Sequence, residues 1–188
     1  MELKRIALAA LAAMSAGMAA YTHSGATAHA TDAAQMASAQ IIDREGNTIG
    51  TAQLRAAPTG VVINIRVTGL PAGKLGMHFH RVGSCSPSED FKDASGHIMP
   101  NDLPHGFFHS EGPHAGNLPN LIVGEDGNAE VELFSNLLVL NQSAAGEKAA
   151  ILDEDGSSLV IHMNEDDHLG QPIGGSGPRI ACGVVMQG

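Results

Sequence analysis

The pattern that most constrains the fold is a two-residue alternation of apolar and polar side chains at 61–68. Ile63, Ile65 and Val67 alternate with Asn64, Arg66 and Thr68. Because successive side chains in a strand point to opposite faces, the pattern predicts a half-buried strand. Shorter apolar runs recur at 40–43, 48–54, 149–152, 158–162 and 180–186. No segment has a long helical period, so the chain predicts an all-β fold, an antiparallel sandwich or barrel.

Turn and loop signals separate these runs. Asp126-Gly127 and Asp155-Gly156 lie between apolar runs and are typical of hairpin turns. Two long stretches, 83–119 and 163–178, are rich in Gly, Pro and polar residues. Loops of this length in a small domain are usually functional or disordered, and most of the histidines lie in or beside these two.

The N-terminal 30 residues are typical of a secretory signal peptide. Lys4 and Arg5 precede an apolar run at 6–20, and Ala28-His29-Ala30 offers a cleavage site. The apolar run is shorter than the roughly 20 residues that span a bilayer, which disfavours the alternative of an uncleaved membrane anchor.

The signal peptide predicts a periplasmic protein that is cleaved near Ala30. Residues 31–38 are rich in Ala and lack periodicity, so we expect a flexible lead-in. Residues 39–188 then form one domain.

The charge and histidine content of the chain limit the kinds of molecule that it can bind. The chain carries a net charge of −10, with 10 Lys and Arg against 20 Asp and Glu, which argues against nucleic acid as a partner. After signal cleavage no membrane partner is expected either. The chain also has 10 histidines, no Trp and one Tyr, and so many histidines in an acidic chain point toward metal binding.

The only cysteines are Cys85 and Cys182. In an exported protein an even pair favours a disulfide. The alternative is two free thiols that bind metal, although neither belongs to a Cys-x-x-Cys motif.

The histidines form a candidate metal site. In a strand, His78 and His80 point to the same face, which is a moderate metal signal that two surface histidines could also produce. His97, His105 and His114 follow in the first long loop, and His162 follows the apolar run at 158–161. Each of these four alone is best interpreted as a solvated histidine, but six together indicate metal. His109 and His168 receive no role, with an exposed loop position as the default.

Several short motifs together resemble bacterial copper/zinc superoxide dismutases. They are Gly76-Met77-His78-Phe79-His80, Gly96-His97, His105-Gly106, Glu111-Gly112-Pro113-His114-Ala115-Gly116, Leu118-Pro119-Asn120, 153–162 and Arg179-Ile180-Ala181-Cys182-Gly183-Val184. The resemblance covers about 41–185 in matching order and spacing. It implies an eight-stranded antiparallel Greek-key sandwich, or barrel, with two long functional loops.

The resemblance also implies roles for individual residues. Copper would be held by His78, His80, His97 and His162, and zinc by His97, His105, His114 and the residue at 117. Asp166 would accept hydrogen bonds from His78 and His105, which orients both rings. Arg179 would guide superoxide, and His97 would bridge the metals and take part in catalysis. Cys85 would tie the metal loop to Cys182.

One position departs from the family pattern. The family has Asp three residues after the last zinc histidine, whereas this chain has Asn117. Zinc prefers Cys, His and carboxylate ligands, so the fourth bond to zinc should be weaker here, or be made by water or another group. Ile98-Met99 also replaces the usual aromatic-Asn pair, and Asp102 is an acid nearby in sequence with no evidence that it reaches the metal.

The implied activity is antioxidant: superoxide becomes O₂ and H₂O₂ as copper cycles between two oxidation states, since Zn²⁺ has no redox chemistry. Two alternatives remain: a dismutase that works with copper alone, and a non-catalytic copper-binding or copper-delivery protein. Arg179 argues against the second, because metal storage needs no cation beside copper. Arg179 is also the only cation that the sequence places near copper. The oligomeric state stays open, with a homodimer as one option.

Overall fold

A computed structural model describes residues 35–100, 102–141 and 148–188. The expected signal peptide and residues 31–34 of the expected lead-in lie outside the described residues, whereas residues 36–38 of that lead-in belong to the first strand. The strands are β1 (Met36–Asp43), β2 (Thr48–Ala57), β3 (Gly60–Val67), β4 (Gly73–Leu75), β5 (Met77–His80), β6 (Leu121–Val123), β7 (Ala129–Ser135), β8 (Leu138–Asn141), β9 (Ala149–Leu152), β10 (Ser158–His162), β11 (Arg179–Val184) and β12 (Met186–Gln187). Two short 3₁₀ helices, η1 (Pro87–Glu89) and η2 (Lys92–Ala94), lie in the first long loop. No helix among the described residues is long and apolar enough to cross a membrane.

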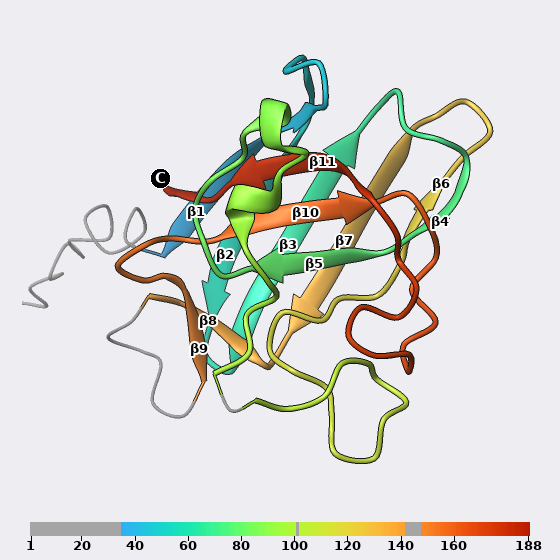
Figure 1. Ribbon diagram of the computed structural model, residues 1–188. Coiled ribbons are helices and arrows are strands. Elements are labelled where there is room, and N and C mark those ends of the chain that lie inside the picture. The colour runs from blue at the N-terminus through green and yellow to red at the C-terminus, as the bar shows by residue number, and fades with distance from the viewer. Residues whose placement is uncertain (1–34, 101, 142–147) are drawn as a thin grey trace, which may run out of the picture.

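The main sheet is antiparallel and curled (Figure 1). Its strand order is β5-β10-β11-β1-β2-β3-β7, and β12 extends it by pairing with β1. The predicted all-β antiparallel architecture is confirmed. Two small pairs accompany the sheet, antiparallel β4–β6 and parallel β8–β9.

The alternation that predicted the strand at 61–68 is visible in burial. On β3, Ile63, Ile65 and Val67 are buried in the core, while Asn64 and Arg66 are exposed. This is the arrangement of a strand with one face on the core and one in solvent.

The two glycine turns form, but they do not join paired strands. Gly127 and Gly156 have positive φ angles of 76° and 68°, which glycine adopts without steric cost. The amide of Gly124 donates to the carbonyl of Asn128 at 2.9 Å, so the turn at Gly127 has the predicted hairpin type. The strands on either side nevertheless pair with strands far along the chain, β6 with β4 and β7 with β3.

Strands β5 and β10 are buried on both faces. Met77 and Phe79 of β5 are 0% exposed and belong to the main core, together with Leu159 and Ile161 of β10. The opposite face of these strands carries histidines and is covered by the loops.

A disulfide fastens the first long loop to the sheet. Cys85 and Cys182 are bonded, with their Cα atoms 5.7 Å apart, so the predicted pairing is confirmed. Phe91 and Ala94 pack beside it on Val160 in a second, smaller apolar cluster. The bond joins residues 97 apart in sequence, and the chain-entropy model gives such a loop about 4–5 kcal/mol.

Candidate metal centre

Backbone pairing places the histidines of the first long loop against β5. His80 and His97 form an isolated antiparallel bridge, as do His78 and Asn117. The amide of Ile98 donates to the carbonyl of Phe79 at 2.9 Å, and the amide of Phe79 donates to the carbonyl of Gly116 at 2.9 Å. The loop therefore adds two short segments to the edge of the sheet, and each segment carries histidines of the site.

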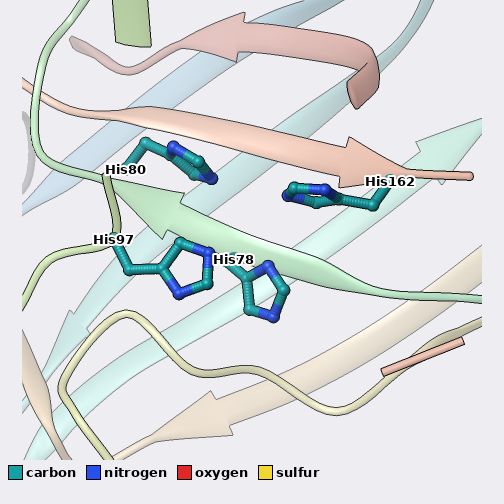
Figure 2. Close-up of side chains that lie close together, drawn as sticks. All are labelled: His78, His80, His97 and His162. Carbon is teal, nitrogen blue, oxygen red and sulfur yellow. The ribbon is translucent and has the colours of Figure 1, made fainter. Parts of the chain in front are cut away.

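The first cluster contains four histidines from three parts of the chain. His78 and His80 come from β5, His162 from the end of β10 and His97 from the loop (Figure 2). One ring nitrogen of each lies within 4.8 Å of the others, and all four side chains are buried. The structure thus brings together every residue for which the sequence predicted copper binding.

The hydrogen bonds of these rings determine which nitrogen is free. His80 Nδ1 donates to the carbonyl of Ser95 at 2.8 Å, and His162 Nδ1 donates to that of Gly177 at 2.9 Å. His78 Nε2 donates to Asp166 Oδ2 at 2.8 Å. Because a neutral imidazole has one N–H and one lone pair, the opposite nitrogen of each ring is an acceptor.

Those three opposite nitrogens, together with one ring nitrogen of His97, are buried and have no hydrogen-bond partner. They are His78 Nδ1, His80 Nε2, His97 Nε2 and His162 Nε2. Leaving buried polar atoms unpaired is costly, and a metal ion would satisfy all four lone pairs at once. Four imidazole donors suit Cu(II), so the residues present fit copper.

Electrostatics keep these rings neutral. Burial and the neighbouring His78 together lower the pKa of His162 to about 4. Burial also lowers the pKa of His80 well below its usual range, with Arg179 adding repulsion. At neutral pH the four nitrogens without a hydrogen-bond partner are thus unprotonated, which is the form that binds metal.

A second cluster shares one ring with the first. His97, His105 and His114 place ring nitrogens within 4.8 Å of one another. His97 Nδ1 faces His114 Nε2 at 3.3 Å, while its Nε2 belongs to the first cluster. Burial lowers the pKa of His114 to about 4. His97 can therefore bridge two ions, and three imidazoles would contribute to a zinc site.

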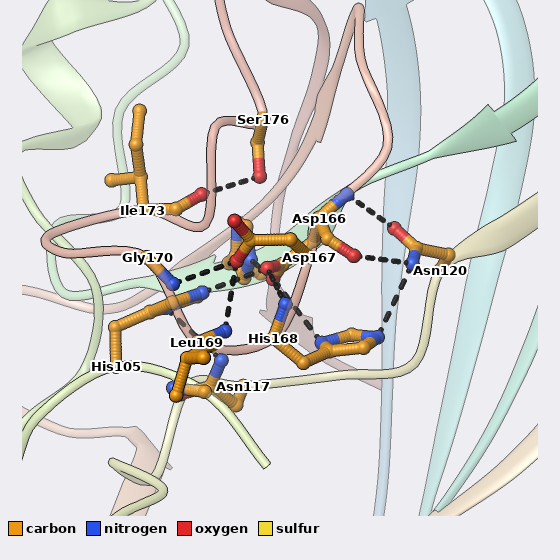
Figure 3. A network of polar contacts seen from close by, with 12 residues as sticks. His105, Asn117, Asn120, Asp166, Asp167, His168, Leu169, Gly170, Ile173 and Ser176 are labelled. Atoms are coloured by element: carbon orange, nitrogen blue, oxygen red, sulfur yellow. Dashed lines mark hydrogen bonds and ion pairs between the residues drawn. The ribbon is translucent and has the colours of Figure 1, made fainter. Parts of the chain in front are cut away.

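Asp166 connects the two clusters through hydrogen bonds (Figure 3). Its Oδ2 accepts from His78 Nε2 at 2.8 Å and its Oδ1 accepts from His105 Nε2 at 2.9 Å. Burial raises the pKa of the carboxyl, but the hydrogen bonds from His105 and His78 outweigh it and hold the pKa well below its usual range. The carboxylate thus orients one ring of each cluster.

Two residues that support Asp166 escaped prediction. The side-chain amide of Asn120 accepts from the Asp166 amide at 2.8 Å and donates to its carbonyl at 2.9 Å. The amide of His168 donates to Asp166 Oδ1 at 2.7 Å. His168 was expected to be exposed, but its side chain is 14% exposed and contacts Phe107 and Phe108. His109 stands outside both clusters, and its Nδ1 accepts from the amide of Glu111 at 3.2 Å.

Asn117 occupies the position at which a fourth zinc ligand was expected. It is 2% exposed, and its Nδ2 lies 3.1 Å from His105 Nδ1. Because His105 Nε2 donates to Asp166, its Nδ1 must accept, so the Asn117 amide donates to the nitrogen that zinc would use. The Asn117 oxygen instead faces the amide of Gly106 at 3.4 Å. Asp102 is exposed and joins none of the candidate metal groups found among the described residues.

Arg179 lines a cavity beside the first cluster. This cavity of about 250 Å³ is lined by Arg179 together with His80, His97 and His162. The guanidinium donates to the carbonyls of Phe91 and Ser95, the latter at 2.6 Å. A cation fixed beside four imidazoles suits a small anion at the metal.

Comparison with known proteins agrees with this geometry. A family model described as copper/zinc superoxide dismutase (SODC) matches residues 48–185. The chain belongs to the copper/zinc superoxide dismutase family. Superoxide dismutase [Cu-Zn] 2 of Aquifex aeolicus is 41% identical over 150 residues, covering 79% of this chain and 85% of that protein. Superoxide dismutase [Cu-Zn] of Caulobacter vibrioides is 41% identical over 142 residues, covering 75% and 80%.

A solved structure extends the family likeness to three dimensions. The crystal structure of a superoxide dismutase-like protein from Bacillus subtilis aligns with a TM-score of 0.73 at 40% identity, covering 79% of this chain and 97% of that chain. The fold is therefore that of the superoxide dismutase family.

The neutral buried histidines predict that acid destabilises the metal-free protein. The folded pKa of His162, about 4, lies below the ordinary value of 6.5, so between these values the unfolded chain binds more protons than the folded chain. We expect the free energy of unfolding to fall as the pH drops from 6.5 to 4, by up to about 1.4 kcal/mol per pH unit for each such histidine. Urea denaturation across this range measures it. His162→Gln should reduce the slope and His109→Gln should not. A urea midpoint that does not change between pH 6.5 and pH 4 would contradict the prediction.

The orientation of Asn117 predicts that zinc is held loosely. Asn117→Asp replaces a hydrogen-bond donor with a carboxylate, whose charge attracts the cation. We expect zinc affinity to rise by about tenfold or more, the scale on which metal-site partners act. Competitive chelation followed by metal analysis measures this, with Asn64→Asp on the exposed face of β3 as the matched charge control. If Asn117→Asp and wild type lose zinc at the same chelator concentration, residue 117 is not a zinc ligand.

Proposed function

We propose that the protein dismutates superoxide to O₂ and H₂O₂ with copper held by His78, His80, His97 and His162. The observation that carries the proposal is the convergence of four buried, unpartnered imidazole nitrogens, with Arg179 lining one cavity together with three of these four rings. A copper-storage site would need the converging imidazole nitrogens but would not need Arg179 beside them.

Copper supplies the redox chemistry when bound, taking an electron from one superoxide and giving one to the next. The chain's own residues do the rest. Arg179 holds the anion through charge and directed N–H groups. When His97 Nε2 is not bound to copper, it is the atom at which the chain can hold one of the two protons that H₂O₂ requires. Asp166 keeps His78 in the tautomer that leaves Nδ1 free.

A specific observation favours the copper-dependent form with weak or absent zinc. Asn117 supplies an N–H rather than a carboxylate to the second cluster. His97 would then be held on its zinc side by His114 alone. Dismutation with copper alone is therefore the second candidate function.

Purified protein tests the proposal directly. We expect about one copper per chain, superoxide dismutation that is lost on copper removal, and recovery with copper but not with zinc alone. Arg179→Ala should keep its copper but lose roughly tenfold or more in kcat/KM at low salt, the scale of electrostatic guidance, while Arg179→Lys retains part of the rate. Wild-type protein that binds copper without dismutating superoxide would instead indicate copper binding or delivery.

We also propose that the protein is exported to the periplasm after cleavage near Ala30. The 1–30 segment has the architecture of a signal peptide, and the Cys85–Cys182 disulfide suits an oxidising compartment. The intact mass of protein from the periplasmic fraction should match that of a chain that begins near Thr31. A mass that includes residues 1–30 would contradict the proposal.

A further inference from the structure

An acidic protein that consumes an anion needs local positive charge. The chain carries a net charge of −10, so superoxide is repelled on average and must be attracted near the cavity. Arg179 provides one charge there, but it is half-buried and donates to two carbonyls. Burial lowers the pKa of Arg179 and the charge of Asp93 raises it, while the Asp93 carboxylate accepts hydrogen bonds from Ser84 and Ser86.

Most other cations among the described residues are neutralised by carboxylates. The pairs are Arg44–Asp90 at 3.8 Å, Lys92–Asp90 at 3.4 Å, Arg66–Glu130 at 2.6 Å and Lys74–Glu165 at 2.8 Å. Arg81 differs from these. Its side chain is exposed, and no carboxylate of the described residues lies within 4.0 Å of it.

Arg81 is held at the rim of the metal cavity. It directly follows His80, and its amide donates to the carbonyl of Gly96 at 3.0 Å. Its Nη2 lies 3.9 Å from the position that a Cβ would take at Gly96, and Gly96 lines the cavity. The charge is therefore close to the entrance without filling it.

Ser95 joins Arg81 to the rest of the site. Its Oγ accepts from Arg81 Nε at 3.1 Å, and its carbonyl accepts from His80 Nδ1 at 2.8 Å and from Arg179 Nη2 at 2.6 Å. One residue thus positions a first-cluster histidine and two guanidinium groups. The tether limits the rotation of Arg81 away from the cavity.

We propose that Arg81 is a second steering cation, which attracts small anions to the cavity and passes them to Arg179. The proposal rests on the proposed function, since superoxide is the anion concerned. Two unit charges of opposite sign about 10 Å apart in water attract each other by slightly less than RT, which corresponds to about a twofold increase in the local concentration of the anion. We expect a two- to threefold contribution at low ionic strength, which disappears near 1 M salt, where the Debye length is about 3 Å.

The test compares variants of the copper-loaded protein. Arg81→Gln should lower kcat/KM for superoxide two- to threefold at low salt and have no effect at 1 M salt. Arg81→Lys should recover most of the loss because it keeps the charge, although it loses the hydrogen bond from Nε to Ser95 Oγ. Arg55→Gln on β2 removes an exposed cation of the same charge across the sheet and should leave the rate unchanged.

A second readout is independent of turnover. Azide is a small anion that binds copper(II) and alters its absorption, so its Kd reports anion attraction to the cavity. Arg81→Gln should weaken azide two- to threefold at low salt, with copper content unchanged. If Arg81→Gln and Arg55→Gln match wild type in both readouts, the inference is wrong even though dismutation stands. If wild type fails to dismutate but Arg81→Gln still weakens azide, the inference stands and the proposed function is wrong.

Discussion

The antiparallel pairing of β5 with β10 determines where every part of the metal centre lies. The register sets Val160 opposite His78 and Leu159 opposite Phe79, so both strands send apolar side chains into the core and turn the other face outward. His78, His80 and His162 share that outer face. The first long loop then bonds to the free edge of β5 and adds His97. A shift of the register by one residue would exchange the histidines with Met77 and Phe79.

The site stores unfavourable free energy in its metal-free form. Burying imidazole nitrogens without partners costs free energy, and the main core, the disulfide and the smaller cluster around Phe91 must offset it. The hydrogen bonds to Ser95, Gly177 and Asp166 prevent the rings from rotating to find partners of their own. This rigidity is the usual way in which a protein prepares a binding site before the ligand arrives.

Local patterns predicted much of this arrangement. The alternation on β3, the shared face of His78 and His80, and the disulfide follow from rules that act over a few residues or from composition. The strand partners of β6 and β7 did not follow from local rules, because the turn at Gly127 does not specify the distant strand with which each of them pairs. Asn120 also went unrecognised, since it lies 46 residues from Asp166 and meets its backbone only through the fold. His168 lies two residues from Asp166, so its contact with the carboxylate is a local turn that sequence reasoning missed. Arg81 was missed for the same reason as Asn120: its proximity to Gly96 depends on the loop's return to β5.

His97 takes part in both clusters, one ring nitrogen in each. Its two nitrogens belong to one conjugated ring, so an ion at Nε2 changes the electron density that Nδ1 offers to a second ion. Such coupling is reciprocal: whatever factor one ion imposes on the affinity for the other, the second imposes on the first. The two sites therefore cannot have independent affinities. A substitution at one metal site also changes the occupancy of the other.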